Sequence, residues 1–266
     1  MVVVLITLPS MVLPSTGPDA AQIVALVAIF GALFTLVEYS ASSPSLVEFR
    51  DAPPFNRVRF SMLFASVLSL SMILRDYVDP SGLTAFFRQS SVALGEVLAS
   101  QYSPFRLMLA VMPEADNALV AEQLRNAAGF SYIMSLWSVI WFVVLLQLQR
   151  WPRIGGPFNV WVNLPTFDPT SGGDVVKRLK RDGRINVFLG FLLPFLIPIV
   201  IKSSAFLGAP FRFDDPQTMI WTVTAWTFLP AGMLMRGIAL VRIANMIKRQ
   251  RKRAYERAAS EDMLLA

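Results

Sequence analysis

Five long apolar segments that are almost free of charge restrict the fold of this chain more than any other feature. They cover about residues 21–39, 60–74, 128–148, 185–201 and 220–241. A helix needs roughly 20 apolar residues to cross the roughly 30 Å of hydrocarbon in a bilayer. The sequence therefore predicts an all-α polytopic membrane helix bundle with about five transmembrane helices. We expect one integral membrane domain over residues 1–266 rather than a soluble fold, since only 16% of the residues are charged.

A sixth apolar run, Met1 to Leu13, stands before the first of these segments. It has no basic region at its start, Pro9 interrupts it, and no pattern of small residues for cleavage follows it. These features are not those of a signal peptide or of a full span. We expect this run to lie at the membrane interface or to pack against the bundle.

The distribution of basic residues predicts the orientation of the chain. Seventeen Lys and Arg residues lie in the segments after the first and third spans and after the last span, and five lie in the segments on the other side. Because basic residues are retained on the cytoplasmic side, we expect the N-terminus outside and the C-terminus in the cytoplasm. The excess of Arg over Lys and the lack of an Asn-X-Ser/Thr sequon favour a bacterial inner (plasma) membrane.

Three segments outside the spans have a pattern of their own. Residues 75–125 contain an amphipathic pattern and are expected to form short interfacial helices that lie on the outer face or cap the bundle. In the cytoplasmic loop 150–184, Asp174 caps a predicted helix over residues 175–182 that Gly183 ends. The basic cytoplasmic tail covers residues 242–266. We expect contacts with anionic lipids from Lys177, Arg178, Lys180, Arg181, Lys248, Arg249, Arg251, Lys252 and Arg253.

Small and hydroxyl-bearing residues recur on two of the predicted spans at helical spacing. They form a stripe on the first span and another on the third: Ala21, Ala25, Ala28, Ala32, Thr35, and Ser131, Ser135, Ser138. In lipid, close packing of small residues and interhelical hydrogen bonds hold helices together, because apolar burial does not. These faces predict helix packing, either within this chain or with another integral membrane subunit.

Two charged residues fall within the spans near their cytoplasmic ends. Counted from the outer ends of their spans, Glu38 and Arg236 both lie about seventeen residues deep, so an intramembrane ion pair between them is one interpretation. The other is that each side chain extends separately to the headgroups.

The composition excludes most catalytic chemistry. The chain contains neither His nor Cys, which removes imidazole bases, thiolate nucleophiles, disulfides and the metal and haem sites that depend on these ligands. Gly172 and Gly173 lack the spacing of a phosphate-binding P-loop. We therefore predict no enzyme activity, no catalytic or metal residues, no bound cofactor and no nucleic-acid partner, with lone carboxylate chemistry as the remaining exception.

Two functional hypotheses are compatible with these features. The first is an accessory or scaffolding subunit of a larger membrane complex, with the bilayer and other membrane subunits as its partners. The second is the permease subunit of a transporter, in which residues 175–182 dock an energising subunit. Pro194, Pro198 and Pro230 predict bends in the last two spans. Such bends occur at transporter substrate sites, and they also occur in ordinary curved helices.

Overall fold

The computed structural model describes residues 1–14, 17–98, 100, 103–111, 118–152, 158–168, 170, 172–204 and 213–265. Over these residues every regular element is a helix, and no strand is formed. Five helices are long and apolar enough to cross a membrane: α2 (Pro18–Ser40), α3 (Phe55–Asp76), α6 (Ala118–Leu148), α8 (Val175–Ser204) and α9 (Pro216–Leu265). Each predicted span lies within one of them, which confirms the all-α membrane bundle.

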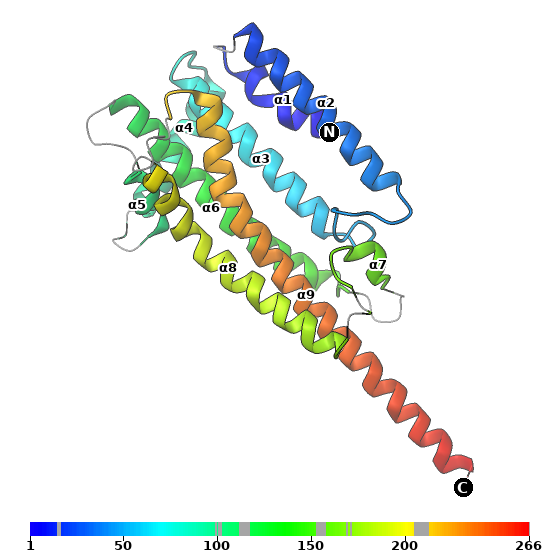
Figure 1. Cartoon of the computed structure of the whole chain (residues 1–266). Helices are drawn as coiled ribbons and strands as arrows, with labels where there is room; N and C mark the ends of the chain where they lie inside the picture. Colours follow the sequence, from blue (N-terminus) through cyan, green and yellow to red (C-terminus); the bar gives the residue numbers. More distant parts are fainter. Residues whose placement is uncertain are drawn as a thin grey trace.

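The helices α3, α6, α8 and α9 form the main body, and α1 (Val2–Val12) and α2 form a hairpin at its side (Figure 1). Leu5 and Leu8 of α1 are buried, and α1 packs against α2 and α3. The first apolar run is thus a helix packed against the bundle, one of the two expected outcomes. Among the described helices α2 packs against α1 and no other, so most of its apolar surface is exposed.

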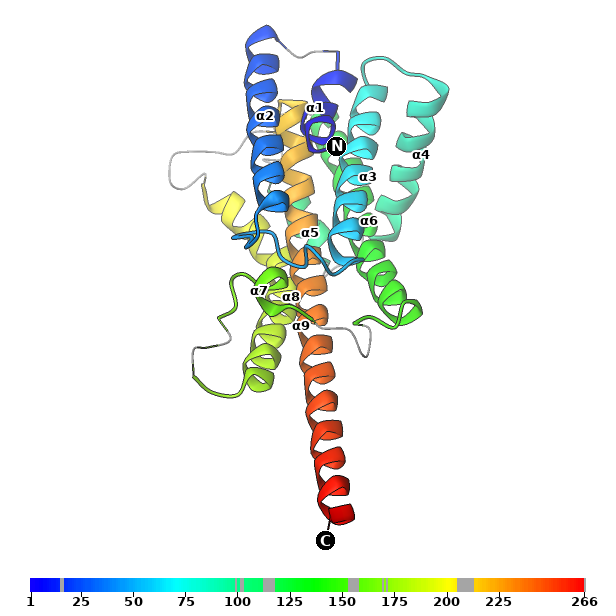
Figure 2. The same ribbon diagram turned by 90° about the vertical axis from the view of Figure 1, so that its right-hand side faces the viewer.

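The segment between α3 and α6 contains α4 (Gly82–Val97) and α5 (Pro104–Leu109). Ser81 caps α4 through a capping box with Thr84. The helix then runs beside α3 and α6 (Figure 2), where Arg88 Nε donates to Asp76 Oδ2 at 2.7 Å. Further along, Gly95 lies against Gly129 of α6. The amphipathic helix is confirmed, but instead of covering the end of the bundle it is part of its wall, because its small residues let α6 approach.

The predicted short helix over residues 175–182 does not end at Gly183, because α8 continues without a break to Ser204. Asp174 does cap its start, since Val176 N donates to Asp174 Oδ1 at 3.3 Å. Gly183 lies against Gly237 and Val241 of α9: a Cβ on Gly237 would lie 2.6 Å from the Gly183 carbonyl oxygen. Gly183 is therefore a helix-packing residue rather than a helix terminator.

The prolines of α8 lie within a continuous helix, and a side chain of α9 binds the backbone group that one of them leaves without a partner. Pro198 has no N–H to donate to the carbonyl of Pro194 four residues earlier. The indole Nε1 of Trp226 donates to that carbonyl oxygen at 2.9 Å, and the Trp226 side chain is buried. The contact fixes α8 against α9, which favours ordinary packing over a mobile break.

The last helix is much longer than the membrane-spanning segment predicted for it. At 1.5 Å per residue, the 50 residues of α9 extend about 75 Å. Its C-terminal part projects beyond the other helices (Figures 1 and 2). All residues from Lys248 to Ser260 are exposed, so roughly 20 Å of helix is largely uncovered, although Arg251 Nη1 still donates to Asp174 Oδ1 at the start of α8.

Candidate functional site

Two connecting segments and the middle of α9 meet at the end of the bundle from which α9 projects, which we call the basic end. The α2–α3 connection and the short helix α7 (Val160–Asn163) are joined by hydrogen bonds: Phe49 N donates to the Asn163 carbonyl at 2.8 Å, and Asp51 N to Asn163 Oδ1 at 3.0 Å. Phe49 is buried against Phe55 and Trp151. The two connections therefore form one folded layer at this end.

A charged pair joins this layer to α9. Glu48 accepts from Arg236 through both carboxylate oxygens, from Nε at 2.5 Å and from Nη2 at 2.7 Å, and its Oε1 also accepts from Thr166 Oγ1 at 2.8 Å. The Glu48 side chain is 11% exposed and the Arg236 side chain is 29% exposed. Paired geometry of this kind gives an arginine–carboxylate contact both strength and orientation.

The predicted pair between Glu38 and Arg236 is not formed. Both residues lie in the described part of the chain, and each has other partners. Glu38 accepts from the backbone N–H groups of Leu46 and Val47, both at 2.9 Å, and from Ser45. Glu38 thus closes the turn after α2. Because the chain folds back at this turn, Glu48 rather than Glu38 lies beside Arg236.

A second guanidinium lies beside this pair. Arg59 of α3 sits between the rings of Phe55 and Phe228, 5.1 and 5.6 Å from their centroids. Its Nε is buried and has no hydrogen-bond partner among the described atoms. A Cβ on Gly232 would lie 3.3 Å from Arg59 Nη2, so the glycine leaves room for the arginine side chain. The aromatic faces partly replace water around this cation.

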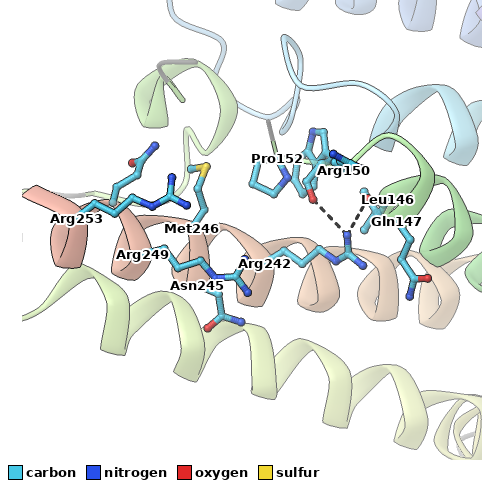
Figure 3. Close-up of a pocket in the computed structure, with 11 residues that line it drawn as sticks. Leu146, Gln147, Arg150, Pro152, Arg242, Asn245, Met246, Arg249 and Arg253 are labelled. Carbon is cyan, nitrogen blue, oxygen red and sulfur yellow. Dashed lines mark hydrogen bonds between the residues drawn. The ribbon is translucent and has the colours of Figure 1, made fainter. Parts of the chain in front are cut away.

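Behind this layer, the end of α6 and one face of α9 border a cavity of about 470 Å³. Arg242 of α9 donates to the carbonyl oxygens of Leu146 and Trp151 at 2.8 and 3.2 Å, so its guanidinium caps the C-terminus of α6 (Figure 3). A cation at this position also favours the helix dipole. Three further arginines line the same cavity: Arg150, Arg249 and Arg253.

The backbone at Arg150 is unusual for this residue type. Trp151 N donates to the Leu146 carbonyl and Arg150 N to that of Gln147, the two hydrogen bonds of a Schellman motif. The motif puts Arg150 in the left-handed region, with φ of 48°. Glycine is favoured there because a Cβ costs about 1–2 kcal/mol. The chain thus keeps an arginine at a position where glycine is the easier residue.

The basic residues predicted to contact anionic lipid are divided between pairing within the chain and exposure. Arg251 Nη1 donates to Asp174 Oδ1 at 2.6 Å, which lowers the pKa of the Asp174 carboxyl. Lys252 Nζ lies 3.6 Å from Glu256 Oε1, and the guanidinium carbon of Arg178 lies 4.6 Å from the centroid of the Phe167 ring. Arg181 Nε lies 3.2 Å from Asp182 Oδ1, and Lys180 is half-buried. The others are exposed along the first turns of α8 and the projecting part of α9: Lys177, Lys248, Arg249 and Arg253.

The predicted small-residue faces have different surroundings. On α6, Ser131 is buried and shares a 2.7 Å hydrogen bond with Thr227 of α9. Ser138 is also buried, whereas Ser135 is half-buried. On α2, Ala28 is buried beside α1, Ala32 and Thr35 are half-buried, and Ala21 and Ala25 are exposed. The α6 face is used within the chain, and the start of the α2 face is open.

Four charged residues at this end of the molecule were not predicted from the sequence to have a structural role: Glu48, Arg59, Arg150 and Arg242. The dense charges between Glu48 and Asp51 were a signal that this connection is more than a linker. Over the described residues, no group of three or more Asp or Glu side chains could hold a metal ion. The arrangement offers guanidinium groups, which bind anions, and not a nucleophile beside a base.

The fold and this end of the molecule define a polytopic helical membrane protein with an arginine-rich end. Comparisons with protein-family models, curated proteins and solved structures found no match for the chain.

Proposed function

We propose that this chain is an accessory or scaffolding subunit of a larger complex in a bacterial inner membrane, with its C-terminus in the cytoplasm and no catalytic chemistry of its own. In this proposal the bilayer holds the bundle, and other membrane subunits bind to the surfaces that the chain leaves exposed. The basic end then faces the anionic inner leaflet.

The observation that carries the proposal is the projecting part of α9. An isolated helix of this length is marginal in water, and a helix that is polar all round needs either pairs along its surface or a partner. Within its described part, Arg251 pairs with Asp174 near its start, and Lys252 pairs with Glu256 at i,i+4 spacing. A second subunit that packs along this helix beyond Arg251 would supply the stabilisation that the bundle does not give there.

The exposed surface of α2 supports the same proposal. Large apolar side chains surround this helix, including Phe30 and Leu36, which are 64% and 65% exposed. Lipid can cover such a surface, but the open small-residue positions Ala21 and Ala25 also allow another helix to approach closely.

Site-specific photo-cross-linking in intact membranes tests the proposal. A photoreactive residue in place of Tyr255, on the projecting helix, is expected to give one discrete protein adduct. The same residue in place of Phe188, exposed in the middle of α8, serves as the control for contacts with lipid. Deletion of residues 254–266 is expected to reduce the size of the complex in mild detergent while the bundle stays folded. The proposal is refuted if the full-length and shortened chains migrate as the same small particle and position 255 gives no adduct.

A permease subunit is the second candidate, favoured by the basic start of α8. Lys177 and Arg181 are exposed at the basic end, beside the projecting helix, where an acidic surface of an energising ATPase could dock. Substitution of both by Gln would then release a co-purifying ATPase. An assembly that keeps its composition after this change would exclude docking through this surface.

A further inference from the structure

The cavity between the end of α6 and α9 combines charge and shape in a way that the packing of the bundle does not require. Positions 242, 245, 246, 249 and 253 place their side chains on one face of α9, and Gln147, Arg150 and Pro152 face them from the end of α6 (Figure 3). A volume of about 470 Å³ falls in the usual range for a small-ligand site.

The charges around this cavity all have the same sign. Arg150, Arg249 and Arg253 have no carboxylate partner in the part of the chain that the structure describes, and none of the described lining residues is acidic. These three side chains are exposed around a partly open cavity, where guanidinium groups of like charge repel one another and an anion between them reverses this repulsion. The arrangement therefore indicates an anion, and planar guanidinium groups suit the oxygens of a phosphate.

The conformation of Arg150 is an independent observation that points to the same ligand. Its left-handed backbone, with φ of 48°, closes the end of α6, a task for which glycine is better suited. Unfavourable conformations of this kind occur at binding sites, where the side chain has a role that offsets the cost. The role available to this side chain is to complete the cationic wall of the cavity.

We propose that this cavity binds the phosphate of an anionic headgroup, with Arg150 and Arg249 as its principal ligands. Asn245 and Gln147 are placed to bind hydroxyl or ester oxygens beside the phosphate. Arg242 is a positioning residue, because its guanidinium is engaged by the α6 carbonyls. The cavity lies next to the predicted ends of two spans, at about residues 148 and 241, which is where lipid phosphates lie. A soluble phosphate has the same chemistry and is distinguished below.

Ligand binding to the purified full-length chain in a neutral detergent tests this proposal. Native mass spectrometry measures binding of dioleoylphosphatidylglycerol and of the zwitterionic dioleoylphosphatidylcholine, and calorimetry measures binding of inorganic pyrophosphate. We expect the double substitution Arg150→Gln with Arg249→Gln to weaken phosphatidylglycerol binding by about tenfold or more, since two charge-assisted contacts are lost. Phosphatidylcholine binding should not respond.

The matched control also removes two positive charges, both from α9 and outside the cavity, by Lys248→Gln with Arg257→Gln. We expect a change of less than about threefold, because an exposed charge adds only a general attraction. Equal losses in the two double variants would overturn the proposal in favour of surface charge alone, and so would a failure of both phosphatidylglycerol and pyrophosphate to bind. Binding of pyrophosphate alone, with the same dependence on the two arginines, would support the site and identify a soluble phosphate as its ligand.

Arg150→Gly separates binding from folding. Glycine is compatible with the left-handed position, so this variant should be at least as resistant to thermal unfolding as the wild type. Its affinity for phosphatidylglycerol should nevertheless fall by about threefold or more through loss of one ligand. If the glycine variant binds as well as the wild type, Arg150 is not a ligand and the proposed site is wrong.

Discussion

The contact between α8 and α9 at Gly237 gives a sharp test of the packing. A Cβ at this position would lie 2.6 Å from the Gly183 carbonyl oxygen, 2.7 Å from Val187 Cγ2 and 3.0 Å from Val187 N. Two of these three atoms belong to the backbone of α8, so no change of rotamer can relieve the contact. Gly237→Ala must therefore push the two helices apart.

The expected loss follows from the balance of two terms. Overpacking of a close contact costs about 1–3 kcal/mol, and the upper half of that range applies when backbone atoms must move. Alanine is a better helix former than glycine by about 1 kcal/mol in water. That gain is largely absent here, because a spanning helix stays helical when it separates from its neighbours in a membrane. The free energy of unfolding of Gly237→Ala should thus fall by about 2 kcal/mol.

Equilibrium unfolding in mixed micelles with an anionic detergent, followed by tryptophan fluorescence, measures this change. Gly82→Ala is the control, since nothing lies within 4 Å of a Cβ there, and its effect should stay within about 0.5 kcal/mol. Adding Val187→Ala to Gly237→Ala removes the side-chain contact and should recover less than half of the loss. A Gly237→Ala protein as stable as the wild type, or a full recovery in the double variant, would refute the account of the backbone contact.

Three further changes test other contacts of the bundle. Trp226→Phe should lower the unfolding free energy by about 1–3 kcal/mol, because it leaves the buried Pro194 carbonyl without a donor. The loss should be clearly smaller in a Pro198→Ala background, where a backbone N–H is restored to this carbonyl. If the effects of the two substitutions simply add, Trp226 does not replace the missing N–H. Glu48→Gln should cost about 2–3 kcal/mol, below the roughly 3–5 kcal/mol of a fully buried pair, and a loss under about 0.5 kcal/mol would contradict the role of this pair. Because the Arg251 guanidinium lowers the pKa of Asp174 from 3.8, this contact stabilises the fold at neutral pH and is lost as the pH falls through the lowered value; the melting temperature of Asp174→Asn should therefore converge with that of the wild type in acid.

The membrane-spanning helices could be predicted from the sequence because their signal is local. An uninterrupted apolar segment of sufficient length has few alternatives to a spanning helix. The ends of these helices were less predictable. No helix breaker follows Val241 in α9, so the helix continues through the basic tail to Leu265 although the apolar segment has ended.

Gly183 illustrates a case in which local and tertiary causes compete. A glycine after a basic amphipathic segment is typical of a helix end, where a left-handed residue is needed. In the structure Gly183 is helical, and the absence of a side chain lets α9 approach instead. Both roles, ending a helix and allowing close packing, call for a glycine in the sequence. What distinguishes them is the contact with Gly237, which lies on another helix more than 50 residues away.

The ion pair at the basic end was mispredicted for a related reason. Counting residues along two straight helices compares depths within the membrane, and by that measure Glu38 matched Arg236. The count ignores connecting segments that fold back. The turn closed by Glu38 returns Glu48 to α9, and Phe49, in the left-handed region with φ of 55°, lies at that return. Loop conformation of this kind depends on tertiary contacts, here the hydrogen bonds to Asn163.

The basic residues that predict orientation also have separate structural roles, and one substitution distinguishes the two. Arg236→Lys keeps the charge and should leave a C-terminal topology reporter unchanged. Lysine cannot reproduce the two parallel hydrogen bonds that Arg236 makes from Nε and Nη2 to the Glu48 carboxylate. We therefore expect a loss of about 1–2 kcal/mol in unfolding free energy, from one charge-assisted hydrogen bond, while Lys248→Arg on the exposed helix changes neither measurement. If Arg236→Lys unfolds like the wild type, a positive charge alone suffices at this position and the paired geometry does not stabilise the basic end.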